Sequence, residues 1–329
     1  MVTESEWLLA DIGGTNARFA IATRSTILCN KIYPTRRYPD LMEALDTFLR
    51  KECEGRKPVM AALALAGPVL GDVVRLTNVD WICDKNLIKQ QFKLEHIEIV
   101  NDFEAVAYAL NRLASDDVSI LQQGEKSPHH PMLVIGPGTG LGVAALVPHD
   151  DGFKAVPTEG GHIRYAPANT RESQMISIIA REHQFVTAEH LISGPGLVNI
   201  YKALCDMSNK IDQALEPLEP ADIVAFARAG DAIAKDTLEE FAAIFGSFTS
   251  QIALSYNALG GLYMAGGVLQ KIGQDFDTMR FLNRFATNPK MANLLRRIPI
   301  VRVNADIPAF MGLQWLLDHK ESKQRGLIK

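Results

Sequence analysis

Two glycine-rich segments, one in each half of the chain, carry residue types that can bind phosphate groups. The first is Ala10-Asp-Ile-Gly-Gly-Thr15, and the second is Gly136-Pro-Gly-Thr-Gly-Leu-Gly142. Glycine lets the backbone approach a phosphate closely, and the N–H groups of a tight turn form a nest for an anion. Asp11 adds an oxygen ligand that suits Mg²⁺, either directly or through a water molecule. The two segments predict a pair of phosphate-binding turns.

Each glycine turn stands between two apolar segments. Residues 8–20 align with residues 132–144, so that Gly14-Thr15 falls on Gly138-Thr139 and each turn gains a hydroxyl donor. Taken singly, either segment is equally well explained as an ordinary β-hairpin, because glycine turns are common there. Taken together, they predict a duplicated architecture with two facing glycine turns.

Neither turn matches the common nucleotide-binding motifs. The chain has no GxxxxGK[ST] sequence, so it is not a P-loop protein. The segment 136–142 departs from GxGxxG, because Leu141 and Val143 stand where the last glycine would fall. A Rossmann domain is therefore disfavoured. Gly266-Gly267 supplies a further turn, which as a bare dipeptide is more often structural than functional.

Several carboxylates could act on a hydroxyl-bearing substrate. Asp102 follows a predicted strand at 96–100, at the strand end where open α/β sheets place ligands, and could serve as a general base. Taken alone, Asn101-Asp102 is better explained as a helix N-cap. Glu159, His162 and Glu189 suit a polyol, because carboxylates accept from hydroxyls and histidine can donate or accept. As isolated residues, Glu189 is better explained as a solvated helix residue and His162 as a hydrogen-bonded structural histidine.

The elements that must position these residues alternate between strand and helix, which favours an α/β sheet covered by helices. The predicted strands are 7–12, 18–22, 25–33, 60–66, 96–100, 132–135, 143–147, 262–265 and 298–303. The predicted helices are 40–53, 84–92, one from Asp102, 171–182, 187–191, 195–207, 221–229, 232–258 and 309–319. The polar stretch 114–131 is predicted to connect two domains.

Composition limits the possible partners. The 329 residues, at roughly 150 per domain, predict two domains, and 47% hydrophobic content excludes general disorder. A net charge of −4 disfavours nucleic acid as a partner. The four cysteines stand alone and predict reduced thiols in a cytosolic protein. The start lacks the features of a signal peptide, and the longest apolar run, 60–70, is far short of the roughly 20 residues that span a bilayer. We therefore expect a soluble cytoplasmic protein without membrane contact.

The ordered set of motifs resembles the bacterial-type ATP-dependent glucokinase family, of the actin/hexokinase-like ATPase superfamily. The resemblance covers nearly the whole chain. It is carried by the residues at 11–18, 76–78, 101–103, 136–142, 159–162, 188–189, 193–197 and 265–267, which agree with the family in type and order. It implies a two-domain actin-like ATPase (ribonuclease H-like) α/β fold with an interdomain cleft. The small domain would comprise 1–107 plus 306–329, including the C-terminal helix, and the large domain 108–305.

The resemblance also implies the reaction and its residues. Asp102 would be the catalytic base for transfer of a phosphoryl group from ATP to glucose, with Mg²⁺ at Asp11, and the enzyme would be a homodimer. The implied glucose ligands are Asn78, Asn101, Asp102, Glu159, His162 and Glu189. The implied ATP ligands are Ala10, Asp11, Ile12, Gly13, Gly14 and Thr15, with Gly138 and Thr139 opposite and Gly266 and Gly267 toward the nucleoside.

Some positions depart from the family pattern without removing a chemical group assigned to catalysis. Ala10 replaces a frequent glycine, Val79 a frequent histidine and Thr158 a frequent glycine. Arg18 has two possible roles, since it could orient the first hairpin or reach a phosphate.

Overall fold

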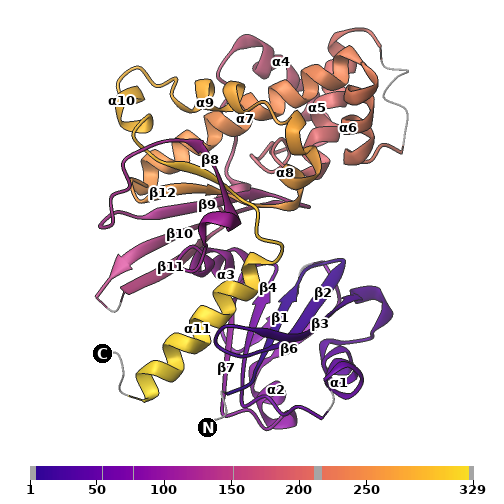
Figure 1. The fold of residues 1–329 in the computed structure, drawn as a ribbon. Coiled ribbons are helices and arrows are strands. Elements are labelled where there is room, and N and C mark those ends of the chain that lie inside the picture. The colour runs from indigo at the N-terminus through magenta and orange to yellow at the C-terminus, as the bar shows by residue number, and fades with distance from the viewer. Residues whose placement is uncertain (1–4, 54, 77, 151, 211–216, 326–329) are drawn as a thin grey trace. The chain divides into compact units, whose positions relative to one another are not determined.

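The computed structural model describes residues 5–53, 55–76, 78–150, 152–210 and 217–325 (Figure 1). By their contacts the residues form two compact units. Unit 1 comprises Met1–Ala114, His149–Pro157 and Ala305–Lys329, and unit 2 comprises Ser115–Pro148 and Thr158–Asn304. From the sequence we predicted domain boundaries after residues 107 and 305. We did not predict that the segment 149–157 belongs to unit 1.

The main sheet of unit 1 has five strands in the order β3-β2-β1-β4-β7. They are β1 (Trp7–Ile12), β2 (Asn16–Ala22), β3 (Ile27–Pro34), β4 (Met60–Leu65) and β7 (His96–Asn101). β1 is antiparallel to β2 and parallel to β4, which is parallel to β7. Every residue of β4 is buried, which explains why its sequence is a continuous apolar run. Two short strands, β5 (Val73–Arg75) and β6 (Ile82–Asp84), form a separate hairpin.

Four α-helices lie in the described part of unit 1. They are α1 (Leu41–Glu52), α2 (Lys85–Gln91), α3 (Asp102–Ala109) and α11 (Pro308–Gln324). α1 and α2 begin where Asp40 and Asp84 accept hydrogen bonds from backbone N–H groups of the first turn. α11 packs against α3, and a Cβ at Gly312 would overlap the carbonyl oxygen of Ala105. Glycine at position 312 is therefore what allows this helix crossing.

The sheet of unit 2 has six strands in the order β11-β10-β9-β12-β13-β8. They are β8 (Val118–Gln122), β9 (Met132–Pro137), β10 (Leu141–His149), β11 (Gly152–Thr158), β12 (Gly261–Met264) and β13 (Ile300–Val303). β9 is antiparallel to β10 and parallel to β12, just as β1 is antiparallel to β2 and parallel to β4. The predicted duplication of strand, glycine turn and strand is confirmed.

The helices in the described part of unit 2 gather on one side of its sheet (Figure 1). They are α4 (Thr170–Ile179), α5 (Gly194–Met207), α6 (Pro220–Ala229), α7 (Ala232–Tyr256), α8 (Gly267–Ile272), α9 (Thr278–Phe285) and α10 (Ala292–Leu295). α7 is largely buried, and its Phe245 packs against Phe281 of α9 with ring centroids 5.3 Å apart. These aromatic contacts form the centre of the unit 2 core.

Two local predictions were wrong, and several elements were missed, among them β5, β6, β11, α8 and α9. Residues 187–191 form a bridge and a turn rather than a helix, because Thr187 pairs with Arg164. The stretch 114–131, predicted as a connection, contains β8, whose half-exposed position at the sheet edge weakens its apolar signal. β11 was missed because only Ala155 of its residues is buried, which leaves little apolar signal. Across the part of the chain that the structure describes, no helix combines the length and apolarity needed to cross a membrane.

Candidate active site

The first predicted phosphate-binding turn connects β1 and β2. The N–H of Gly13 donates to Asn16 O at 3.0 Å, which closes the turn. The hydroxyl of Thr35, just after β3, donates to Gly14 O at 2.8 Å and to Thr15 O at 3.1 Å. The turn is thus held in one conformation by a residue outside it.

Asp11 is the charged residue of β1 beside this turn. It lies opposite Arg18 in the β1–β2 register, and Arg18 Nη1 donates to Asp11 Oδ2 at 2.8 Å. Burial raises the pKa of Asp11, and the Arg18 guanidinium opposes that rise. The neighbours Ala10 and Ile12 are fully buried in the unit 1 core, so only their backbone can serve a ligand. The contact supports a role for Arg18 in orienting Asp11 within the first hairpin.

Asn78 lies against the first glycine turn. A Cβ at Gly14 would overlap the Cβ of Asn78, so the glycine makes room for this side chain. The residue before it, Thr77, lies outside the described residues. The structure therefore brings one predicted sugar ligand and one predicted phosphate ligand together in unit 1.

Asn101 and Asp102 have separate roles at the start of α3. Asn101 is the N-cap, because its Oδ1 accepts from the N–H groups of Phe103 and Glu104, and Glu104 completes a capping box. Asn101 Nδ2 donates to Gly67 O at 3.1 Å. Asp102 is the first helical residue, is half-buried, and accepts from Phe103 N at 2.8 Å. The helix cap, which was the alternative explanation for Asp102, is therefore supplied by Asn101.

The second glycine turn, between β9 and β10, is held by other glycine segments of unit 2. Gly138 N donates to Gly140 O at 2.8 Å, and Gly194 N at the start of α5 donates to Gly138 O at 2.9 Å. Gly266 has a φ of 103°, and a Cβ there would overlap the carbonyl oxygen of Pro137. As a bare dipeptide, Gly266-Gly267 was a weak indication of a binding site in the sequence. In the structure Gly266 lies against the second glycine turn.

Glu159, His162 and Glu189 form one cluster in unit 2. Glu159 precedes the 3₁₀ turn Gly160–His162, and His162 Nε2 lies 3.7 Å from Glu159 Oε2. His162 Nδ1 lies 3.9 Å from Glu189 Oε1. Glu159 and His162 are more than half exposed, and Glu189 is 30% exposed. The cluster thus offers two carboxylates and an imidazole to a polar ligand.

The same cluster is attached to the second glycine turn. Leu141 N, at the end of that turn, donates to Glu189 Oε2 at 2.9 Å. A Cβ at Gly140 would overlap this carboxylate oxygen, and a Cβ at Gly161 would overlap the carbonyl oxygen of Leu141. Glu189 N in turn donates to Gly161 O at 2.9 Å. Residues 140, 141, 161 and 189 therefore form one packed arrangement. Glycine is required at position 161, where a Cβ would meet backbone, and at position 140 it leaves room for the Glu189 carboxylate.

His190 was not predicted to take part in the site. Its Nδ1 accepts from Thr187 N at 3.0 Å, and its ring stacks on His183 with centroids 4.1 Å apart. These contacts fix the turn that carries Glu189. The sequence carries no signal that His190 positions Glu189. The contacts of His190 with Thr187 and His183 form only in the observed turn, and this segment was predicted to be a helix.

We expect protonation of His190 to destabilise the protein. Burial first, then the stacked His183 and the nearby His162, lower its pKa from 6.5, and Glu189 opposes them. The unfolded chain therefore binds the proton more readily. The stabilising contribution is fully present above pH 6.5 and is lost as the pH falls from there through the folded-state pKa. Unfolding midpoints measured against pH should fall more steeply for the wild type than for His190→Asn, which keeps an acceptor without titrating. Parallel curves would contradict this.

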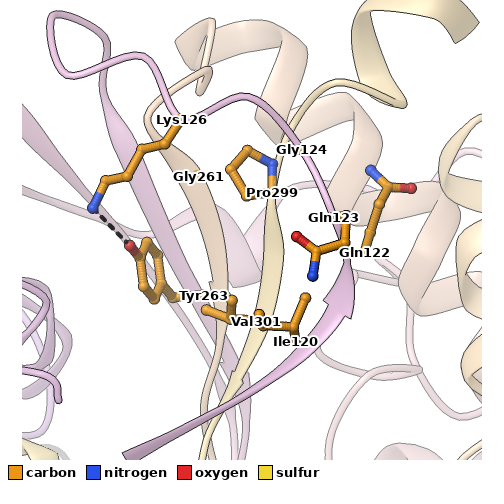
Figure 2. A pocket seen from close by; sticks show the side chains of 9 residues that line it. All are labelled: Ile120, Gln122, Gln123, Gly124, Lys126, Gly261, Tyr263, Pro299 and Val301. Atoms are coloured by element: carbon orange, nitrogen blue, oxygen red, sulfur yellow. Dashed lines mark hydrogen bonds between the residues drawn. The ribbon is translucent and has the colours of Figure 1, made fainter. Parts of the chain in front are cut away.

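A shallow pocket of unit 2 contains none of the predicted site residues (Figure 2). It lies over β8, β12 and β13 and holds about 160 Å³. Ile120 and Val301 form part of its apolar lining, and Lys126 Nζ donates to the hydroxyl of Tyr263 at 3.3 Å. The candidate active-site residues are therefore defined by their contacts within each unit and not by this cavity.

The two sheets and their strand orders define an actin-like ATPase fold, the fold of the glucokinases. The structure matches the crystal structure of a glucokinase from an Antarctic psychrotroph with a TM-score of 0.85 and 33% sequence identity, over 95% of this chain and 99% of that chain. The sequence profile of the family described as Glucokinase matches residues 8–320, so the chain belongs to the glucokinase family.

Two sequence relatives differ in length. The chain is 36% identical over 318 residues to the glucokinase of Saccharophagus degradans, covering 95% of this chain and 98% of that protein. It is 38% identical over 320 residues to the Bifunctional protein glk of Burkholderia pseudomallei, covering 97% of this chain and 50% of that protein. The chain therefore spans about half the length of this longer relative.

Proposed function

We propose that the protein transfers the γ-phosphoryl group of ATP to the 6-hydroxyl of D-glucose, giving glucose 6-phosphate and ADP at the entry to glycolysis. The observation that carries the proposal is the bond from Leu141 N to Glu189 Oε2, which joins the predicted sugar ligands to a phosphate-binding turn. A kinase needs both substrates held in register, because phosphoryl transfer depends mainly on positioning and charge stabilisation.

In this proposal Asp102 is the general base. A sugar hydroxyl is a weak nucleophile, and a carboxylate within hydrogen-bond distance can take its proton as the new P–O bond forms. Asp102 lies at the carboxyl end of β7, and Asn101 supplies the helix cap in its place. Asn101 Nδ2 donates one of its two hydrogens to Gly67 O. We propose that the second hydrogen is donated to the sugar.

The acceptor we propose is a neutral sugar. Glu159 and Glu189 accept hydrogen bonds from pairs of hydroxyls, and His162 between them can donate or accept. These two carboxylates would repel an acidic or already phosphorylated sugar. In unit 1, Asn78 would offer the sugar a neutral amide.

Asp11 and the two glycine turns suit the binding of ATP together with Mg²⁺. Asp11 Oδ2 is bonded to Arg18, which leaves Oδ1 for a hard cation or its bound water. No group of three or more His, Cys, Asp or Glu side chains in the described ranges could hold a metal ion by itself. This fits an ion held mainly by nucleotide phosphates and water, where it would offset phosphate charge. Residues 10–15 and 138–139 would bind the phosphates, and 266–267 would lie toward the nucleoside.

Formation of glucose 6-phosphate from glucose and Mg²⁺-ATP tests the proposal directly. Mannose and fructose as acceptors, and ADP and polyphosphate as donors, establish whether the substrate assignment is correct. Glucose binding without phosphoryl transfer to any acceptor would overturn the assignment and indicate a sugar sensor. The homodimer implied by the family resemblance stays a prediction, which sedimentation of the purified protein tests.

Gly140→Ala should raise KM for glucose by at least about tenfold, because the new Cβ displaces the Glu189 carboxylate from Leu141 N and a hydrogen bond to a charged group contributes about 1.5–3 kcal/mol. Gly138→Ala is the matched control in the same turn. Its Cβ would have Gly140 O as nearest neighbour at 4.0 Å, so KM for glucose should stay near the wild-type value. Equal KM values for glucose in the two variants would contradict the role of Gly140.

A further inference from the structure

Two cysteines of unit 1 lie in contact although the sequence predicted that all four stand alone. Cys29 is on the edge strand β3, and Cys53 is the residue that ends α1. Their Sγ atoms are 3.5 Å apart, and the residues are 24 positions apart in the chain. The pairing escapes a search for CxxC motifs because it depends on α1 packing against the sheet.

The two thiols differ in accessibility. Cys29 is half-buried on an edge strand between the exposed residues Leu28 and Asn30, whereas Cys53 is fully buried. Burial and the contact with Cys29 raise the pKa of the Cys53 thiol. Because the thiolate is the reactive form, an oxidant in solution should meet Cys29 first.

The charged groups around the pair are nearly balanced. Glu52, at the end of α1, is followed closely by Arg56, and these act on Cys53 in opposite directions. Lys31 Nζ of β3 lies 3.7 Å from Glu52 Oε1, and the hydroxyl of Tyr33 donates to the same oxygen at 3.4 Å. Groups of both charge signs therefore flank the pair.

We propose that Cys29 and Cys53 are a modification site, at which a low-molecular-weight disulfide such as oxidised glutathione forms a reversible intramolecular disulfide. The Cys29 thiolate attacks one sulfur of the reagent, which gives a mixed disulfide at Cys29 and releases one thiol. Cys53 then loses its proton and attacks the Cys29 sulfur, which releases the second thiol. Two protein thiols and one reagent disulfide thus become one protein disulfide and two reagent thiols.

The bond would tie the edge of the unit 1 sheet to the end of α1. Closing it requires the sulfur atoms to approach from 3.5 Å to about 2 Å, a shift that side-chain rotation can supply between two residues already in contact. The closed loop includes Thr35, which holds the first glycine turn. A cross-link restricts the unfolded chain, so the oxidised protein should have a Tm several degrees above that of the reduced protein.

The test treats the reduced, folded protein with oxidised glutathione, then counts thiols under denaturing conditions and maps the peptides. We expect the four thiols of the wild type to fall to two, with the Cys29 and Cys53 peptides linked and the Tm raised. Dithiothreitol should restore all four. Retention of four thiols, or a link that involves Cys83 or Cys205, would overturn the proposal. This measurement needs no variant.

Variants separate the two steps. Cys53→Ser should stop at the intermediate and carry one glutathione on Cys29, whereas Cys29→Ser should keep three unmodified thiols. Cys83→Ser and Cys205→Ser are the matched controls, since both residues are buried thiols outside the pair and their variants should still lose two thiols. Glutathione on Cys53 of the Cys29→Ser protein would contradict the proposed order of attack.

Discussion

The Asp102→Asn protein is expected to turn over glucose about 10²- to 10⁴-fold more slowly than the wild type, because its amide cannot accept the proton of the 6-hydroxyl. Glucose binding should be preserved. Asparagine has the same shape, its Oδ1 can still accept from Phe103 N, and the cap of α3 comes from Asn101. The loss should therefore appear in kcat, with little change in the Kd for glucose measured by calorimetry.

Asp40→Asn is the matched control for this prediction. Asp40 also stands at the start of a unit 1 helix, where its Oδ1 accepts from Glu43 N at 2.8 Å. Asparagine caps a helix about as well as aspartate, so kcat should not change. If Asp102→Asn and Asp40→Asn both kept wild-type turnover, Asp102 would not be the base.

The second large effect concerns Glu172, a fully buried carboxylate of α4. Its Oε1 accepts from Arg284 Nη2 at 2.6 Å, and its Oε2 accepts from Ala168 N at 2.7 Å and from the Tyr165 hydroxyl at 3.0 Å. Every one of these partners is a donor. A glutamine would place an NH₂ group against donors at one of the two positions and would leave the Arg284 charge uncompensated.

Glu172→Gln should therefore lower the free energy of unfolding by about 3–5 kcal/mol, the range for breaking a buried ion pair. The effect should appear as a lower urea midpoint. Glu239→Gln is the control, because Glu239 pairs with Arg280 but is 46% exposed, and exposed pairs contribute about 0–1 kcal/mol. Similar urea midpoints for the two variants would show that the Glu172 network does not stabilise unit 2.

Some elements could be predicted from the sequence because local residues determine them. β1 was predicted at its observed bounds, and α1 was predicted to within one residue at each end, because apolar spacing is a local signal. β8 was not predicted, and the turn that carries Glu189 was predicted as a helix. In both, pairing with a distant segment decides the conformation: β8 with β13, and Thr187 with Arg164.

The sequence by itself determined the family, the duplicated unit of strand, glycine turn and strand, and the residue types available for chemistry. Glycines, carboxylates and their spacing are read directly from the chain, and they identified Asp102, Glu159 and Glu189 as candidates. Only the tertiary structure decided which of these residues meet. It joined Glu189 to Leu141, Asp11 to Arg18 and Cys29 to Cys53. Such contacts depend on how sheets and helices pack, and packing brings together residues whose separation in the chain carries no local signal.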